Sequence, residues 1–273
     1  MSIDPERGQR RDCSPEVWKA IRIALLLVAL GVVATQAWLD RRSTRDWTET
    51  LWVGIYPLNG DGSDAADSYI ASLDGKRFAG IEDFFAREAP RYSIAIDRPV
   101  RVELYPRLAR LPPRLAPDAG VLTTMAWSLR LRWYALRAPE PAGLAPPDIR
   151  VFVLYHDPDR SGAVPHSLGL QKGLLGVVYA FAERSMDGAN AVVIAHETLH
   201  TLGATDKYEL DTLQPLVPDG LAEPDRTPQF PQDSAEIMAG RRAISAGESV
   251  MPDSLRDVVI GAATAREIAW GLE

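Results

Sequence analysis

The stretch that decides the fold is HETLHTLGATD, residues 196–206 of a 273-residue chain. Its two histidines, His196 and His200, are four positions apart. On an α-helix they therefore lie one turn apart and about 40° from each other around the axis. Two imidazoles on one helix face can bind the same metal ion. Glu197 lies next to that ion without having to bind it, so its carboxylate can take a proton from a metal-bound water. The stretch predicts a zinc-hydrolase site.

The residues on either side of this stretch favour a helix that ends in a sharp turn. Residues 190–195, NAVVIA, are mostly apolar, and Asn190 is a suitable N-cap. Gly203 permits the turn because glycine adopts positive φ at little cost. The turn brings Asp206 back toward the metal as the third ligand. Rival third ligands are three glutamates further along the chain: Glu209, Glu223 and Glu236.

A methionine follows in the segment SAEIMAG, residues 234–240. Metzincin metalloproteases combine an extended HExxHxxGxx(H/D) motif with a later methionine in a tight turn beneath the metal. This chain resembles them in both segments, at His196, Glu197, His200, Gly203, Asp206 and Met238. The patterns HETxHxLGxxDxY and EIMAG look most like the snapalysin-type branch, which has an aspartate ligand. The immune-inhibitor-A type is similar in its GxxDxY segment.

The resemblance implies a role for each matched residue. His196, His200 and Asp206 would bind Zn²⁺, Glu197 would be the general base, and Met238 would form the Met-turn. Tyr208, two positions after Asp206, is a candidate to donate a hydrogen bond to the oxyanion of a tetrahedral intermediate. Packing beneath the turn, or orienting Asp206, is the alternative role for this tyrosine.

The apolar pattern of the whole chain predicts an α/β (α+β) fold with a mixed sheet. Strands are expected at residues 51–58, 100–105, 149–155 and 174–182. Helices are expected at residues 65–73, 81–89, 121–137 and 254–272, the last capped by Asp253. The metzincin resemblance implies a twisted sheet, an active-site helix, a Met-turn and a C-terminal helix, with a cleft between two halves. Residues 209–235 are expected to supply the cleft walls, and an edge strand at residues 168–178 is a further candidate to line the cleft.

Composition limits the classes of function. The formal net charge is −7, which argues against nucleic acid as a partner. The single cysteine, Cys13, excludes an internal disulfide and a cysteine-rich zinc site. An apolar content of 46% supplies one substantial core.

Residues 23–39 form an uncharged apolar run flanked by Trp18 and Trp38. Lys and Arg number five before the run and three after it, in residues 40–48, which favours a cytoplasmic N-terminus. The expected organisation is a cytoplasmic tail at 1–22, a transmembrane signal anchor at 23–39, a linker at 40–48 and a zinc metalloprotease domain at 49–273. The alternatives are a cleaved signal peptide, with a secreted product, and a buried helix of a soluble protein.

The expected function is that of a membrane-anchored zinc endopeptidase with an extracytoplasmic catalytic domain and a peptide or protein substrate. The rival interpretation is a non-catalytic, zinc-stabilised extracytoplasmic binding domain. Glu197 argues against the rival, because a purely structural zinc site needs no general base.

Overall fold

The computed structural model describes residues 46–271 except 117, 118, 142, 145, 172 and 173, together with residues 18–19, 22–24, 27–28 and 31. The chain divides into two units, Met1–Arg41 and Arg42–Glu273. Most of the predicted anchor at 23–39 lies outside the described residues. Among the residues that are described, no helix is both long enough and apolar enough to cross a bilayer.

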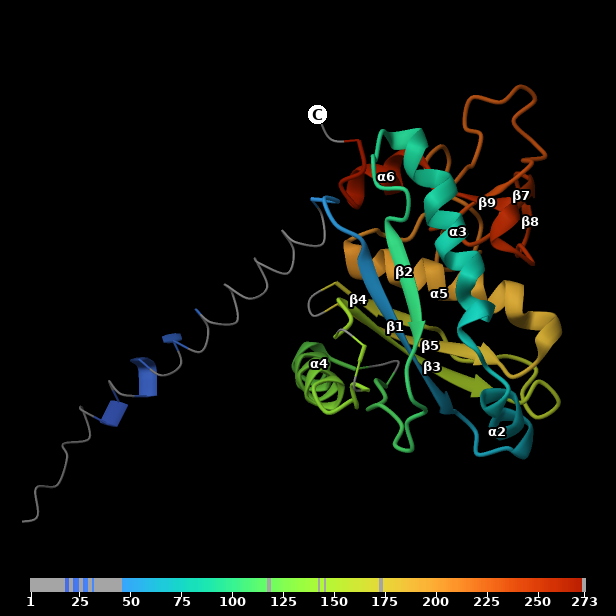
Figure 1. Ribbon diagram of the computed structural model, residues 1–273. Helices are drawn as coiled ribbons and strands as arrows, with labels where there is room; N and C mark the ends of the chain where they lie inside the picture. The colour runs from blue at the N-terminus through green and yellow to red at the C-terminus, as the bar shows by residue number, and fades with distance from the viewer. Residues whose placement is uncertain are drawn as a thin grey trace, which may run out of the picture. The chain divides into compact units, whose positions relative to one another are not determined.

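A five-stranded, mostly parallel sheet forms the centre of the larger unit, in the order β2-β1-β3-β5-β4 (Figure 1). The strands are β1 (Leu51–Asn59), β2 (Val100–Leu104), β3 (Ile149–His156), β4 (Leu168–Leu170) and β5 (Leu175–Phe181). Strand β4 is antiparallel to β5, and the other neighbours are parallel. The predicted mixed α/β sheet is confirmed. Strands β1, β3 and β5 are nearly continuous apolar runs because parallel sheets are covered on both faces.

Alternate residues of β1, β3 and β5 pack into two separate cores. Val53 and Ile55 of β1 face the core shared with α2 (Asp64–Ala71), α3 (Ala79–Glu88) and α5 (Asp187–Leu202). Tyr56 and Leu58 face the opposite core, which contains α4 (Val121–Ala135). Figure 1 shows α4 on the other side of the sheet from α3 and α5. The two-residue period of a strand produces this division.

The chain after α5 is mostly irregular, with two small sheets. Strand β6 (Ala235–Glu236) pairs with β9 (Val258–Val259), and β7 (Arg242–Ser245) pairs with β8 (Glu248–Val250). The last helix is α6 (Ala262–Glu267). Four 3₁₀ helices complete the described elements: η1 (Gly75–Phe78), η2 (Ala89–Tyr92), η3 (Arg184–Met186) and η4 (Leu255–Asp257).

The predicted long helix at 254–272 is wrong. Residues 255–257 form the η4 turn, residues 258–259 form β9, and only residues 262–267 are helical. The β-branched Val258 and Val259 pair with β6, and Val258 is fully buried. Tertiary pairing therefore overrides the helical pattern of this segment.

Trp47, which falls within the predicted linker, belongs to the folded unit. Its side chain is 6% exposed, and its indole N–H donates to the carbonyl oxygen of Ile268 at 2.8 Å. Its ring packs edge-on against Trp270 with centroids 5.3 Å apart. The folded unit therefore begins before residue 49. Trp47 links the chain just before β1 to the C-terminal segment.

Candidate metal centre

Helix α5 carries the predicted zinc residues and is fixed to the sheet at its start. It begins at Asp187, so Asn190 is not its N-cap. The buried Asn190 instead accepts from the backbone N–H of Phe181 at 3.1 Å and donates to the carbonyl of Phe181 at 2.9 Å. The N-cap prediction fails because η3 leads directly into α5 and moves the start of the helix upstream. Asn190 ties the helix to the end of β5.

The predicted glycine turn at the end of α5 is confirmed. Gly203 has φ of 108°, in the left-handed region that favours glycine. The backbone N–H of Ala204 then donates to the carbonyl of Leu199 at 3.0 Å. The chain reverses here and returns past the helix face that carries the histidines.

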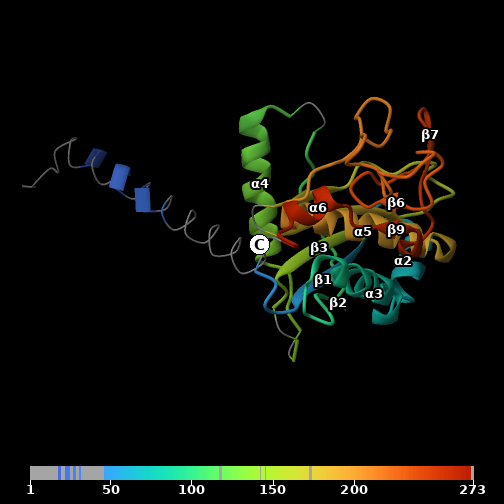
Figure 2. The same cartoon turned by 90° about the horizontal axis from the view of Figure 1, so that it is seen from above.

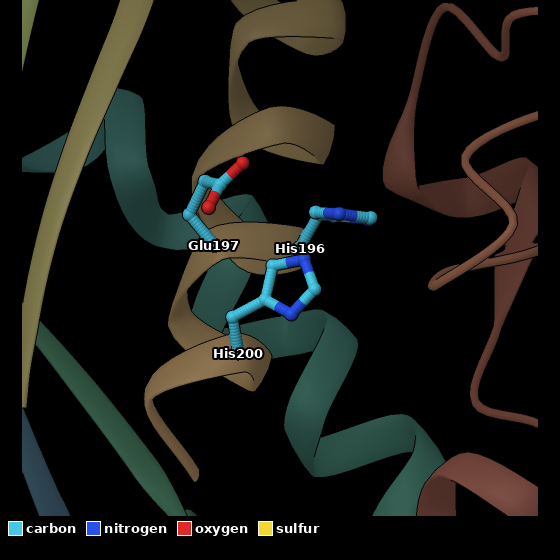
Figure 3. A group of neighbouring side chains, drawn as sticks. All are labelled: His196, Glu197 and His200. Atoms are coloured by element: carbon cyan, nitrogen blue, oxygen red, sulfur yellow. The ribbon is translucent and has the colours of Figure 1, made fainter. Parts of the chain in front are cut away.

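Three side-chain atoms converge at this point. Asp206 Oδ1 lies 3.2 Å from His196 Nε2 and 3.1 Å from His200 Nε2. Figure 3 shows both imidazoles projecting from successive turns of α5 to the same side. Zinc bonds of 2.0–2.2 Å in a tetrahedral site place neighbouring ligand atoms about 3.3 Å apart. The observed spacing fits a single zinc ion held by these three atoms.

The hydrogen bonds of the imidazoles leave the converging nitrogens as acceptors. His196 Nδ1 lies 2.9 Å from the carbonyl oxygen of Ile237, and His200 Nδ1 lies 2.8 Å from that of Ala204. A carbonyl oxygen can only accept, so each Nδ1 carries a proton, and in its neutral form each ring presents an Nε2 lone pair toward Asp206. Buried Asp206 Oδ1 accepts no hydrogen bond of good geometry from the described residues. When both rings are neutral, three acceptor atoms therefore face one point, an arrangement that a bound cation satisfies.

The electrostatics of the site point the same way. Burial lowers the pKa of His196, but the nearby Asp206 and Glu197 carboxylates outweigh burial and raise it overall. Burial raises the pKa of Asp206, but the two histidines outweigh burial and hold it well below its ordinary value. Both shifts describe a pocket that favours positive charge between these groups.

Glu197 lies beside the converging atoms and keeps one free oxygen. Its side chain is 5% exposed, and its Oε2 has no hydrogen-bond partner among the described residues. His196, Glu197 and His200 offer ligand atoms that all lie within 4.8 Å of one another. Burial, opposed by the histidines, raises the pKa of Glu197. A carboxylate with a raised pKa is suited to accept a proton near neutral pH.

Tyr208 lies at the same site and is half-buried. It lines a cavity beside α5, described below, together with Glu197 and Asp206. Burial is the main cause that raises the pKa of its hydroxyl, and the charges of Asp206 and Glu197 add to the effect. The hydroxyl therefore stays protonated and can donate a hydrogen bond.

A tight turn at Met238 supports the site from below. Met238 is fully buried, and its carbonyl accepts from the backbone N–H of Lys207, next to Asp206, at 2.9 Å. The preceding Ile237 supplies the carbonyl that orients His196. The turn thus contacts both the first histidine and the segment that carries Asp206.

Glu236 organises this turn rather than facing the two histidines. Its fully buried carboxylate accepts four hydrogen bonds, from the backbone N–H groups of Met238, Ala239 and Gly261 and from the Thr264 hydroxyl. Burial, partly offset by these donors, raises its pKa. The carboxylate joins the Met238 turn to α6.

The other two rival glutamates are also engaged elsewhere. Glu223 accepts from the backbone N–H of Asp233 at 3.0 Å, and Glu209 accepts from the Thr212 hydroxyl at 3.1 Å. Among the four carboxylates considered as a third ligand, Asp206 is the one that lies in contact with both histidines.

A cavity of about 640 Å³ opens over the candidate metal centre. Of the predicted wall at 209–235, Leu210 and Leu213 line it. Most of its other walls come from residues 164–169, from α5, and from residues 239–241 and 251. Residues 168–169 fall in the edge strand expected at 168–178, whereas residues 164–167, 239–241 and 251 were not expected in the cleft, because their contribution depends on long-range packing.

Gly169, on β4, contributes to the site although its sequence position did not predict it. A Cβ at this position would lie 2.5 Å from His200 Cβ and 2.6 Å from the carbonyl oxygen of Glu197. Glycine therefore lets edge strand β4 pack directly on α5 beside the histidines. The sequence signal is a glycine inside a short apolar segment, which indicates close backbone approach.

No known protein-family model matches the chain, and the comparison with curated proteins finds no significant match.

Proposed function

We propose that the chain is a zinc-dependent endopeptidase of the metzincin type. The observation that carries this proposal is the convergence of two Nε2 lone pairs and one Asp206 oxygen at the spacing of tetrahedral zinc ligands. The three protein ligands would be His196, His200 and Asp206, leaving a fourth position for water or substrate. The partnerless Glu197 oxygen beside them favours catalysis over a purely structural zinc site.

The chemistry divides between the metal and the chain. Bound zinc would lower the pKa of water toward neutrality and polarise the scissile carbonyl. Glu197 would take the proton of the attacking water and deliver it to the leaving amine. Its burial supports this role, because burial raises the pKa of the carboxyl toward the working pH. Tyr208 would donate a hydrogen bond from its hydroxyl group to the oxyanion that develops at the carbonyl.

The cleft suits an extended peptide. Strand β4 is an edge strand of the sheet, and it packs against α5 beside the metal centre. Its outer backbone groups can pair with a substrate in the manner of an added strand. Val164, Leu168, Leu210, Leu213 and Met251 give the cavity apolar walls for substrate side chains.

The Met238 turn and the apolar run at 23–39 support a metzincin architecture and a membrane location. The buried Met238 turn, bonded to His196 through the Ile237 carbonyl, supports its assignment as the Met-turn. The apolar run at 23–39 supports a single membrane span with the catalytic domain on the extracytoplasmic side. Protease added to spheroplasts should digest the domain and spare residues 1–20. Recovery of intact chain in the soluble cytosolic fraction would contradict the span.

The decisive experiment is Glu197→Gln in zinc-loaded protein. Gln keeps the shape of Glu but cannot accept the proton, so cleavage of a broad peptide library should fall about 10²–10⁴-fold while zinc content is unchanged. The control is Glu248→Gln, at an exposed position of β8. Equal turnover by wild type and Glu197→Gln would exclude the mechanism. A wild type that holds one zinc yet cleaves no peptide would favour the non-catalytic binding domain.

A further inference from the structure

Helix α4 has two apolar faces, of which only one is covered. Trp127, Leu131 and Ala135 are buried against the sheet. A second set of large apolar side chains on the same helix, at its C-cap included, is exposed by 58–82%: Leu122, Met125, Leu129, Trp133 and Leu136. In Figure 2, α4 stands along one edge of the folded domain. A helix that is apolar on both faces indicates that a second surface covers the outer one.

The exposed residues form a continuous stripe. Their spacings of three and four residues place all five within about 80° of arc around the helix axis. The buried residues lie on the opposite side, so the stripe is directed away from the sheet. Isolated exposed apolar residues are normal on protein surfaces, whereas an aligned row of this length is not.

Arginines border the stripe on both sides. At about 100° per residue, Arg130 and Arg137 lie along one border and Arg132 along the other. The Arg137 guanidinium lies 4.2 Å from the centroid of the Trp133 ring, at the edge of the stripe. Long arginine stems can cover apolar surface while their charged ends reach outward. This arrangement is typical of helices that lie in a membrane interface.

The surrounding sequence is strongly basic although the chain is acidic. Residues 105–139 contain six arginines and one aspartate, a net charge of +5 (6 − 1), in a chain of net charge −7. Arg110 and Arg114 in this region are also exposed. Charge of this sign attracts anionic headgroups. A second copy is a poorer fit, because a self-complementary contact would bring the bordering arginines of both copies together.

We propose that the outer face of α4, defined by Leu122, Met125, Leu129, Trp133 and Leu136 with its bordering arginines, docks on the surface of an anionic lipid bilayer. The predicted anchor would keep this contact within reach. It ends at Leu39, and Trp47 is already buried in the domain, so the intervening chain spans at most about 30 Å. Docking would fix the orientation of the domain that carries the candidate active site relative to the bilayer.

The first test uses residues 42–273, the compact unit that contains Trp47 and both cores. This fragment should float with vesicles of mixed phosphatidylcholine and phosphatidylglycerol, and only weakly with phosphatidylcholine alone. Combined Leu122→Ser, Leu129→Ser and Trp133→Ser should lower the partition coefficient about 1,000-fold, since each inserted apolar side chain contributes about tenfold. These positions are exposed, so the melting temperature should not fall.

Matched variants separate the apolar and charged contributions. Val217→Ser removes an apolar side chain that is 59% exposed elsewhere, and it should leave vesicle binding unchanged. Arg130→Ser and Arg137→Ser should each weaken binding to anionic vesicles about fivefold, with a smaller effect at high salt.

A second test uses the full chain in the same vesicles. With Cys13→Ser, a cysteine introduced as Met125→Cys and labelled with an environment-sensitive fluorophore should show blue-shifted emission that lipid-borne quenchers reduce. The same label at Glu248→Cys should remain in water. Absence of vesicle binding by residues 42–273, or equal binding by the triple-serine variant, would overturn the proposal. A dimer in solution that the triple-serine variant dissociates would assign the face to a second copy instead.

Discussion

Removing Asp206 is the sharpest test of the metal centre. Its Oδ1 is the one carboxylate oxygen found 3.1–3.2 Å from both histidine nitrogens in the described structure, so Asp206→Ala deletes one of three converging ligands. Structural zinc sites of four ligands bind with about 10–16 kcal/mol, or roughly 3 kcal/mol per ligand. We therefore expect the zinc Kd to rise at least about 100-fold, while the histidine pair retains weak binding.

Linkage converts that loss into a measurable change in stability. At a free zinc concentration of about 1,000 times the wild-type Kd, binding stabilises the folded state by about 4.1 kcal/mol. The same concentration is about 10 times the Kd of Asp206→Ala and stabilises it by about 1.4 kcal/mol. For a domain of this size these values correspond to zinc-dependent increases in Tm of about 12 °C and about 4 °C.

The assay is thermal unfolding of residues 42–273 with buffered zinc and with chelator. Glu223→Ala is the matched control, because Glu223 was a rival ligand and lies in a separate set of hydrogen bonds. It should retain the wild-type zinc shift. A full zinc shift in Asp206→Ala would refute the assignment of this ligand, and loss of the shift in Glu223→Ala would support a distal glutamate instead.

Substitutions at three further positions test how the site and the surrounding fold are held, each by urea unfolding in the presence of chelator. Glu236→Gln replaces an acceptor of four hydrogen bonds with a side chain that can accept only about half of them. It should lower the free energy of unfolding by about 3–6 kcal/mol. A decrease below about 1 kcal/mol would contradict the role of Glu236. Glu267 bonds to Lys207 and Thr205, and these groups outweigh burial to lower its pKa. Its contribution to stability should therefore be present above the unfolded pKa of about 4.3 and disappear as the pH falls through the lower folded value, so the wild-type advantage over Glu267→Gln should shrink in acid; an advantage that persists there would exclude this linkage. Trp47→Ala should lower the free energy of unfolding by about 3–5 kcal/mol, and Trp47→Phe should lower it less. Similar losses in both variants would show that the indole hydrogen bond dominates.

Glu236→Gln is not a suitable control for the Glu197→Gln cleavage assay. From its position in the sequence alone, Glu236→Gln is expected to leave most activity and to serve as a control for Glu197→Gln. Because Glu236 holds the turn whose Ile237 carbonyl orients His196, its substitution should disturb the candidate metal centre as well as the fold. Exposed Glu248 is the better control.

The sequence by itself determined the features that depend on local periodicity. The four-residue spacing of His196 and His200 sets both rings on one helix face, and Gly203 sets the turn after it. Continuous apolar runs likewise located β1, β3 and β5 to within one or two residues, because buried parallel strands leave that pattern. These features need no information about distant parts of the chain.

Only the tertiary structure decided the features that depend on contacts between distant segments. It placed Asp206, rather than Glu209, Glu223 or Glu236, beside the histidines, and it gave Gly169 its place against α5. It also turned the predicted last helix into η4, β9 and the short α6, since pairing of Val258 and Val259 with β6 outweighs local helix propensity. The same packing covers one apolar face of α4 and leaves the other exposed, a distinction that the sequence pattern of that helix does not contain.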